Sequence, residues 1–145
     1  MVVIRKLKRE DVKTLAELAK ECFSVPWTAN AFAELVEDTN SRYLVAVVQD
    51  EVVGCCGVTN AFGDGDINIV MVAKAYRGQG IASRMLEELF CSGKELGIGD
   101  YTLEVRVSNA AAIHVYEKLG FVSEGIRPRF YEKPVEDAMI MWRRV

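Results

Sequence analysis

A glycine-rich turn between a β-rich run and a long helix limits most tightly how this chain can fold. The run from Ile67 to Val72 precedes Arg77-Gly78-Gln79-Gly80, and an amphipathic helix follows that ends near Gly97. Its apolar residues recur at three- and four-residue spacing: Ile81, Met85, Leu86, Leu89, Phe90 and Leu96. The run from Tyr101 to Val107 then alternates apolar and polar residues, as a strand does. Strand, turn, helix and strand make a βαβ unit with parallel strands and a right-handed crossover.

The segments around this unit predict hairpins and shorter helices. Further strands are expected at residues 2–5, 43–48, 52–59, 121–124 and 138–142, with helices at 11–23, 28–36 and 109–118. Thr28 is expected to cap the second helix, and Ser108 or Asn109 the last one. A turn is expected across residues 62–66. The sequence therefore predicts a mixed α/β fold in one domain of residues 1–145, with a mostly antiparallel central sheet, one parallel pair and flanking helices.

Composition excludes several functional classes. The chain has 145 residues and a net charge of −3, which argues against a general nucleic-acid binder. No uncharged stretch approaches the roughly 20 apolar residues that span a bilayer, so no membrane partner is expected. In the opening segment Met1–Lys6 the charges follow the apolar residues, the reverse of a secretory signal. We expect a cytoplasmic protein.

The cysteines and the single histidine predict no metal site. Cys55 and Cys56 are adjacent, no C-x-x-C pair occurs, and His114 is the only histidine. Cys22 and Cys91 lie in helical patterns beside apolar neighbours. We interpret them as reduced, buried structural residues.

The glycine turn is suited to binding a diphosphate. The first N–H groups of a helix lack internal acceptors, and glycine lets an anion approach them closely. A plain βα turn is the alternative interpretation. The sequence lacks both G-x-x-x-x-G-K-[ST] and a dinucleotide-type G-x-G-x-x-G pattern. Coenzyme A is therefore the natural diphosphate carrier to consider.

The turn also resembles the signature of the GNAT family of acyl-CoA-dependent N-acetyltransferases. Their pattern Arg/Gln-x-x-Gly-x-Gly/Ala matches Arg77-Gly78-Gln79-Gly80-Ile81-Ala82. Segments that resemble the ribosomal-protein alanine N-acetyltransferase subgroup are 23–28, 101–113, 115–121 and 136–141. The chain departs from the family pattern at Lys74, where proline is common, and at Ala82, the last cradle position. Neither change removes a backbone donor.

The resemblance implies acetyl-CoA as acyl donor, with no metal. Main-chain groups of Val70, Met71 and Val72 would pair with the pantetheine amides. Arg77 would add charge beside the diphosphate, and Asn109 would hydrogen-bond the carrier arm near the thioester. The backbone donors for the diphosphate would come from Gly78, Gln79, Gly80, Ile81, Ala82 and Ser83.

The resemblance also implies the catalytic groups. Glu104 would act as general base through water, and Tyr116 as general acid for the departing thiolate. A main-chain N–H near Met71 or Val72 would stabilise the oxyanion. A solvated strand glutamate and a core tyrosine are the alternative interpretations. Further aromatic residues, whose alternative role is packing, could line an acceptor groove: Phe23, Trp27 and Tyr131.

The acceptor is expected to be a protein N-terminal peptide. An α-amine titrates near about 7.7–8.0 and a lysine near about 10.4, so deprotonating lysine costs about 3 kcal/mol more. The subgroup resemblance implies the N-terminal alanine of a small-subunit ribosomal protein. Acetylation of a small amine or of a protein lysine remains an alternative, as does a non-catalytic CoA-binding regulatory module.

Overall fold

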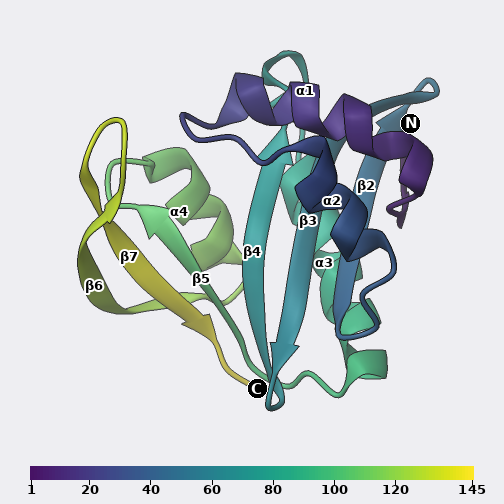
Figure 1. The fold of residues 1–145 in the computed structure, drawn as a ribbon. Helices are drawn as coiled ribbons and strands as arrows, with labels where there is room; N and C mark the ends of the chain where they lie inside the picture. Colours follow the sequence, from purple (N-terminus) through teal and green to yellow (C-terminus); the bar gives the residue numbers. More distant parts are fainter.

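The computed structural model describes residues 1–145 and contains one seven-stranded sheet with the strand order β1-β2-β3-β4-β5-β7-β6 (Figure 1). The strands are β1 Val2–Lys6, β2 Ser41–Val48, β3 Glu51–Ala61, β4 Asp64–Val72, β5 Tyr101–Arg106, β6 Val122–Tyr131 and β7 Glu136–Arg143. Only β4 and β5 pair in parallel; every other neighbouring pair is antiparallel. The predicted mixed sheet with one parallel pair is confirmed.

The helices cover both faces of this sheet. They are α1 Val12–Cys22, α2 Ala29–Val36, α3 Ile81–Gly93 and α4 Ala110–Lys118, with short 3-10 turns at Arg9–Asp11, Lys74–Tyr76 and Lys94–Leu96. In Figure 1, α1 and α2 lie in front of the sheet and α3 lies behind it. An apolar core lies on each face of the sheet. Leu15 and Phe32 belong to the core under α1 and α2, and Met85 and Leu103 belong to the core under α3 and α4. No helix has the length and apolar composition to cross a bilayer.

Polar side chains fix where two of the helices begin. The Thr28 hydroxyl accepts a hydrogen bond from the Ala31 N–H at 3.2 Å, and α2 starts at the next residue. Asn109, rather than Ser108, caps α4, because its Oδ1 accepts from the Ala112 N–H at 3.2 Å. Both caps satisfy N–H groups that the first helical turn cannot.

Two local expectations were wrong. The turn before β4 is shorter than predicted, because the strand begins at Asp64 and only Phe62 and Gly63 connect it to β3. Cys91 is exposed and Cys22 half-buried, so neither is the core residue that its helical pattern suggested. Their apolar neighbours reflect the amphipathic pattern of the helix, which does not resolve positions at the margin of the apolar stripe.

The parallel strands separate soon after they meet. The β4–β5 ladder consists of Gly65 with Tyr101 and Asp66 with Thr102 only. Beyond these pairs the carboxyl end of β4 has no neighbour on its β5 side. An open strand edge therefore faces the gap between the two strands.

A bulge in β4 accompanies this separation. Gly57 of β3 pairs with Ile69 and Val58 with Ile67, so Asn68 is an extra residue in β4. The bulge reverses the strand's alternation: Ile67 packs in the α3/α4 core, whereas Ile69 packs in the α1/α2 core. The face of the sheet to which alternate β4 side chains point is therefore reversed where β4 leaves β5.

Candidate active site

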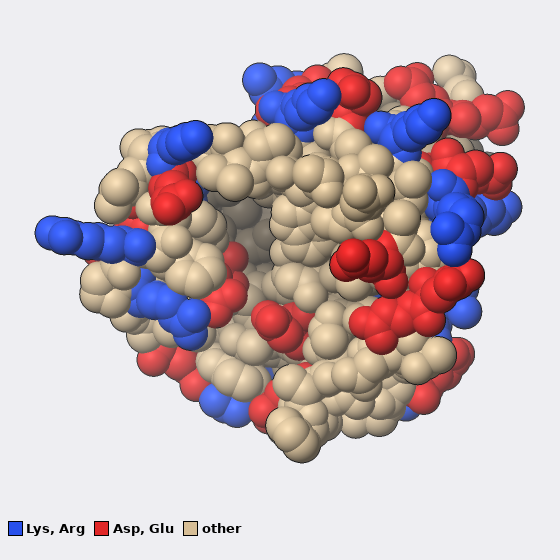
Figure 2. Space-filling model, in the orientation of Figure 1, with Lys and Arg blue, Asp and Glu red and all other residues tan.

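A cleft of about 700 Å³ lies where β4 and β5 separate. Figure 2 shows the hollow on the α1/α2 side, with acidic side chains along its lower border and basic ones on its left. Four of the predicted site residues line it: Val70, Glu104, Asn109 and Tyr116. The three aromatic residues expected to border an acceptor groove, Phe23, Trp27 and Tyr131, also line this cleft.

The glycine turn presents a row of free backbone donors. No N–H from Gly78 to Ser83 donates a hydrogen bond within the protein, and the first bonded one is Arg84 N–H to Gly80 O at 3.1 Å. Gly78 and Gly80 have φ of 78° and 79°, and a Cβ added at either would meet no atom within 4 Å. Glycine is therefore required by backbone conformation, not by crowding. With the positive end of α3 behind them, these donors suit a diphosphate.

Arg77 lies at this turn but does not point into it. Its Nε donates to Val72 O at 2.9 Å, and its Nη2 contacts Cys22 Sγ at 3.4 Å. The guanidinium thus joins the end of β4 to the end of α1. The expectation that it supplies charge beside a diphosphate is not met in this conformation, because the β4 carbonyl holds the guanidinium instead.

The open edge of β4 exposes alternate residues. Ala73 N–H donates to Val53 O at 2.8 Å, so Ala73 and, two residues earlier, Met71 direct their main-chain groups to β3. Val70 and Val72 direct theirs to the open edge, where Val72 O already accepts from Arg77. Met71 is therefore wrongly placed among the edge donors, since strand alternation turns its amide inward.

Glu104 projects from β5 on the face opposite the α3/α4 core, as its alternation predicted. Its side chain is 23% exposed, and Arg127 Nη2 lies 3.7 Å from its Oε2. Burial and the negative charge of Asp66 raise the pKa of the Glu104 carboxyl, while Arg127 opposes the shift. A raised pKa makes this carboxylate a better proton acceptor.

Tyr116 projects from α4 on the other side of the cleft. The residue is only 8% exposed, packs against Phe121, and burial raises the pKa of its hydroxyl, which stays protonated. The hydroxyl has no partner among the protein's hydrogen bonds, and no fully buried polar side-chain atom lacks one. It therefore reaches the cleft as a free donor.

Asn109 has a divided role in the structure. Its Oδ1 caps α4 by accepting one hydrogen bond, so both Nδ2 donors and one further Oδ1 lone pair remain for a ligand in the cleft. The carbonyl oxygen of a carrier amide could accept a hydrogen bond from this Nδ2.

The cleft thus joins the two faces of the sheet. The free donors at the start of α3 and the Tyr116 hydroxyl belong to the α3/α4 side, whereas Glu104 projects to the α1/α2 side. Two reactants can enter from opposite faces and meet between the strands. Such an arrangement permits direct group transfer without a covalent intermediate on the protein.

Known proteins are similar to this chain in sequence and in fold. Residues 12–121 match the model of the acetyltransferase (GNAT) family. The chain belongs to the GNAT family. It is thus an acetyltransferase of the family that uses acetyl-CoA, as the glycine turn and its flanking motifs predicted.

Several relatives of this GNAT chain carry informative names. A putative [ribosomal protein bS18]-alanine N-acetyltransferase of Bacillus subtilis is 34% identical over 140 residues, which cover 96% of this chain and 93% of that protein. The [ribosomal protein bS18]-alanine N-acetyltransferase of Escherichia coli strain K12 is 31% identical over 145 residues, covering 97% and 96%.

Solved structures agree with the GNAT fold. The ribosomal-protein-S18-alanine N-acetyltransferase of Escherichia coli superposes with a TM-score of 0.90 at 26% identity, covering 100% of this chain and 94% of that one. Ard1 of Thermoplasma volcanium has a TM-score of 0.89 at 24% identity, with 99% and 97% covered, and shows the fold alone.

The GNAT cleft is lined by two further acidic residues that sequence reasoning missed, Asp66 and Glu132. The Asp66 carboxylate makes no hydrogen bond or ion pair, and burial raises its pKa. The sequence predicted a turn over residues 62–66, so Asp66 was not expected to project from a strand. Extending the strand alternation back from Asn68 would have placed Asp66 on the same face.

A further missed residue, Arg106, fixes the wall of the GNAT cleft formed by the β6–β7 turn. Its guanidinium donates to Glu132 O at 2.9 Å and to Pro134 O at 3.0 Å, and lies 4.5 Å from the centre of the Tyr131 ring. Glu136 Oε1 lies 3.2 Å from it. The planar guanidinium thus holds the turn against the end of β5.

Proposed function

We propose that this GNAT enzyme transfers an acetyl group from acetyl-CoA directly to the N-terminal α-amine of a protein, the N-terminal alanine of a small-subunit ribosomal protein, in the cytoplasm. The observation that carries the proposal is the cleft, which has the Tyr116 hydroxyl on one side and the Glu104 carboxylate on the other, while the free N–H groups of residues 78–83 lie at the start of α3. The bS18-alanine N-acetyltransferase names of the relatives support the acceptor.

The donor would lie along the α3/α4 side. N–H groups from Gly78 to Ser83 would bind the diphosphate, and the open edge of β4 at Val70 and Val72 would pair with the pantetheine amides as an added strand. The Asn109 Nδ2 would donate to a carbonyl of the same arm. These contacts would direct the thioester between β4 and β5.

Transfer would then proceed in one attack and one departure. Glu104 accepts a proton from the amine through water, and the amine nitrogen bonds to the thioester carbon. The main-chain N–H of Val70, which lies on the open edge and lines the cleft with Glu104 and Tyr116, would stabilise the oxyanion, while the Val72 N–H and the Val70 C=O pair with the carrier arm. As the carbon–sulfur bond breaks, Tyr116 gives its proton to the thiolate and regains one from solvent.

The pKa of the acceptor amine favours an α-amine over a lysine. An α-amine is partly neutral near pH 7, whereas a lysine amine requires about 3 kcal/mol more for deprotonation. A flexible peptide end also fits an opening bordered by Phe23, Trp27 and Tyr131.

Thiol release with matched peptides tests the proposal. Peptides that begin with Ala, Ser or Thr should release CoA from acetyl-CoA, whereas the same peptides blocked at the N-terminus but carrying a lysine should not. Absence of release with every free N-terminus would contradict the proposal. Faster turnover of polyamines or aminoglycosides than of any peptide would contradict the proposed acceptor.

A further inference from the structure

The bulge residue of β4, Asn68, lies in the cleft on the acceptor side. It projects from the strand between Asp66 and the Ile69 side chain of the α1/α2 core, and it lines the same cleft as Glu104. Two hydrogen bonds hold its side-chain amide. Asn68 Oδ1 accepts from the Tyr43 hydroxyl, and its Nδ2 donates to Thr59 Oγ1 at 3.1 Å.

The orientation of this amide is set by a chain of hydrogen bonds that begins at a carboxylate. Asp38 can only accept, so Ser41 donates to it at 2.8 Å. Thr59 must then donate to the Ser41 oxygen at 2.8 Å, which leaves the Thr59 oxygen to accept from Asn68. The Asn68 Nδ2 consequently faces Thr59, and its Oδ1 faces Tyr43.

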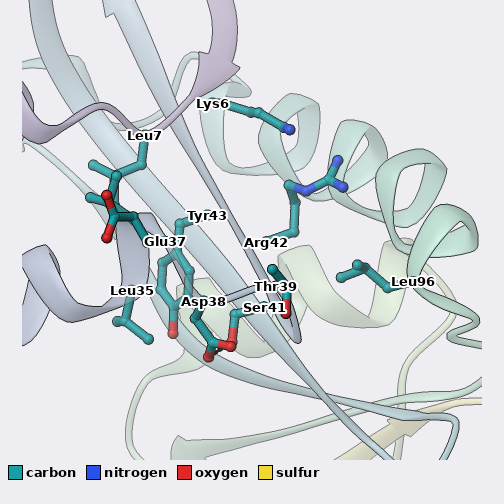
Figure 3. Close-up of a pocket in the computed structure, with 11 residues that line it drawn as sticks. Lys6, Leu7, Leu35, Glu37, Asp38, Thr39, Ser41, Arg42, Tyr43 and Leu96 are labelled. Carbon is teal, nitrogen blue, oxygen red and sulfur yellow. Dashed lines mark hydrogen bonds between the residues drawn. The ribbon is translucent and has the colours of Figure 1, made fainter.

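The Tyr43 hydroxyl reaches Asn68 by crossing a strand. Tyr43 of β2 pairs with Gly57 of β3, and a Cβ at Gly57 would lie 2.0 Å from the Tyr43 ring. Only glycine lets the ring pass over β3 to β4. Figure 3 shows Tyr43 beside Ser41 and Asp38, at the border of a second cavity of about 310 Å³. Tyr43 is 4% exposed and packs near Trp27 of the cleft wall, so its position is fixed.

The fixed amide keeps unused hydrogen-bonding capacity. A carboxamide has two N–H donors and two acceptor lone pairs, and the protein uses one of each at Asn68. The remaining donor and acceptor match the C=O and N–H of a peptide group. We propose that Asn68 binds a main-chain peptide group of the acceptor, and that Tyr43 and Thr59 are positioning residues that orient its amide. This inference rests on the proposed function and adds that the acceptor is recognised through its backbone.

Steady-state kinetics with an alanine-initiated peptide at saturating acetyl-CoA test the proposal. Asn68→Ala should raise the peptide KM about threefold to tenfold, the effect of about 0.5–1.5 kcal/mol for a hydrogen bond, with kcat within about twofold. The Kd for acetyl-CoA should not change. Tyr43 and Thr59 do not contact the acceptor in this proposal. Tyr43→Phe and Thr59→Val should nevertheless each raise the peptide KM. Either substitution combined with Asn68→Ala should raise the peptide KM no further than Asn68→Ala alone.

Thr39→Val is the matched control, because Thr39 is exposed and outside the hydrogen-bond chain. It should leave the peptide KM unchanged. Thermal unfolding of each variant checks that the fold is retained.

A chemical change in the acceptor gives a second readout. Methylating the first or the second peptide nitrogen removes one N–H, and one of these peptides should lose affinity with the wild-type protein but not with Asn68→Ala. An unchanged peptide KM in Asn68→Ala, or full additivity with Tyr43→Phe, would overturn this inference alone. Failure of the wild-type protein to acetylate any peptide would instead overturn the proposed function, and this inference with it.

Discussion

Tyr116 is the residue whose proposed chemistry depends on a single atom. Tyr116→Phe keeps the buried ring but removes the hydroxyl that reaches the cleft. We expect kcat to fall by roughly 10²-fold or more, because the thiolate then leaves without its proton donor. The KM for acetyl-CoA should change little. Turnover near that of the wild type would remove Tyr116 from the mechanism.

Glu104 gives a prediction about pH. A general base works when deprotonated, so kcat at saturating peptide should fall as pH drops through the raised pKa of Glu104. Asp66→Asn removes the negative charge that helps raise that pKa, so this acidic limb should move to lower pH. Arg127→Gln removes the opposing charge and should move the limb to higher pH.

Full pH–rate profiles of both variants measure the direction in which the acidic limb moves. A limb that stays in place in both would show that Glu104 does not control it. Glu104→Gln should abolish the limb and most of the activity.

At the scale of elements, the turn before α3 depends on a left-handed glycine. Gly80 caps α3 with φ of 79°, so Gly80→Ala should cost roughly 1–2 kcal/mol of stability and weaken acetyl-CoA binding by disturbing the donor row. Denaturant unfolding and calorimetry with acetyl-CoA measure both effects. Gly99→Ala is the control, because its added Cβ would meet only Val145 in ordinary contact at 3.8 Å. Equal losses in the two variants would contradict the account.

The β6–β7 turn depends on one guanidinium. Arg106→Lys keeps the charge but loses the paired contacts to the Glu132 and Pro134 carbonyls. We expect faster hydrogen exchange in residues 131–136 and a severalfold higher peptide KM, with acetyl-CoA affinity retained. Unchanged exchange would show that the turn is held by other contacts.

On the scale of the whole molecule, regular patterns predicted the architecture. Helical spacing and the caps at Thr28 and Asn109 place the helices, and alternation in β5 correctly directs Glu104 away from the core. These features are local, so a sequence expresses them directly. The family motifs add the cofactor class, which periodicity alone does not indicate.

Features that depend on contacts between distant segments could not be predicted. The bulge at Asn68 is set by its register with β3, and the same register decides that Val70 and Val72, and not Met71 between them, direct their main-chain groups to the open edge. The Arg77 guanidinium is held between Val72 O and Cys22 Sγ, and Cys22 is remote in sequence. Arg106 and Tyr43 act through residues remote in sequence, and no local pattern marks them.

The central claim is direct acetyl transfer to a peptide α-amine across the cleft between β4 and β5. Tandem mass spectrometry of one peptide that carries both a free N-terminal alanine and a lysine, incubated with this protein and acetyl-CoA, tests it most directly. The account predicts a single acetyl group on the α-nitrogen, formed together with free CoA. An acetyl group found only on the lysine, or no acetylated peptide, would contradict it.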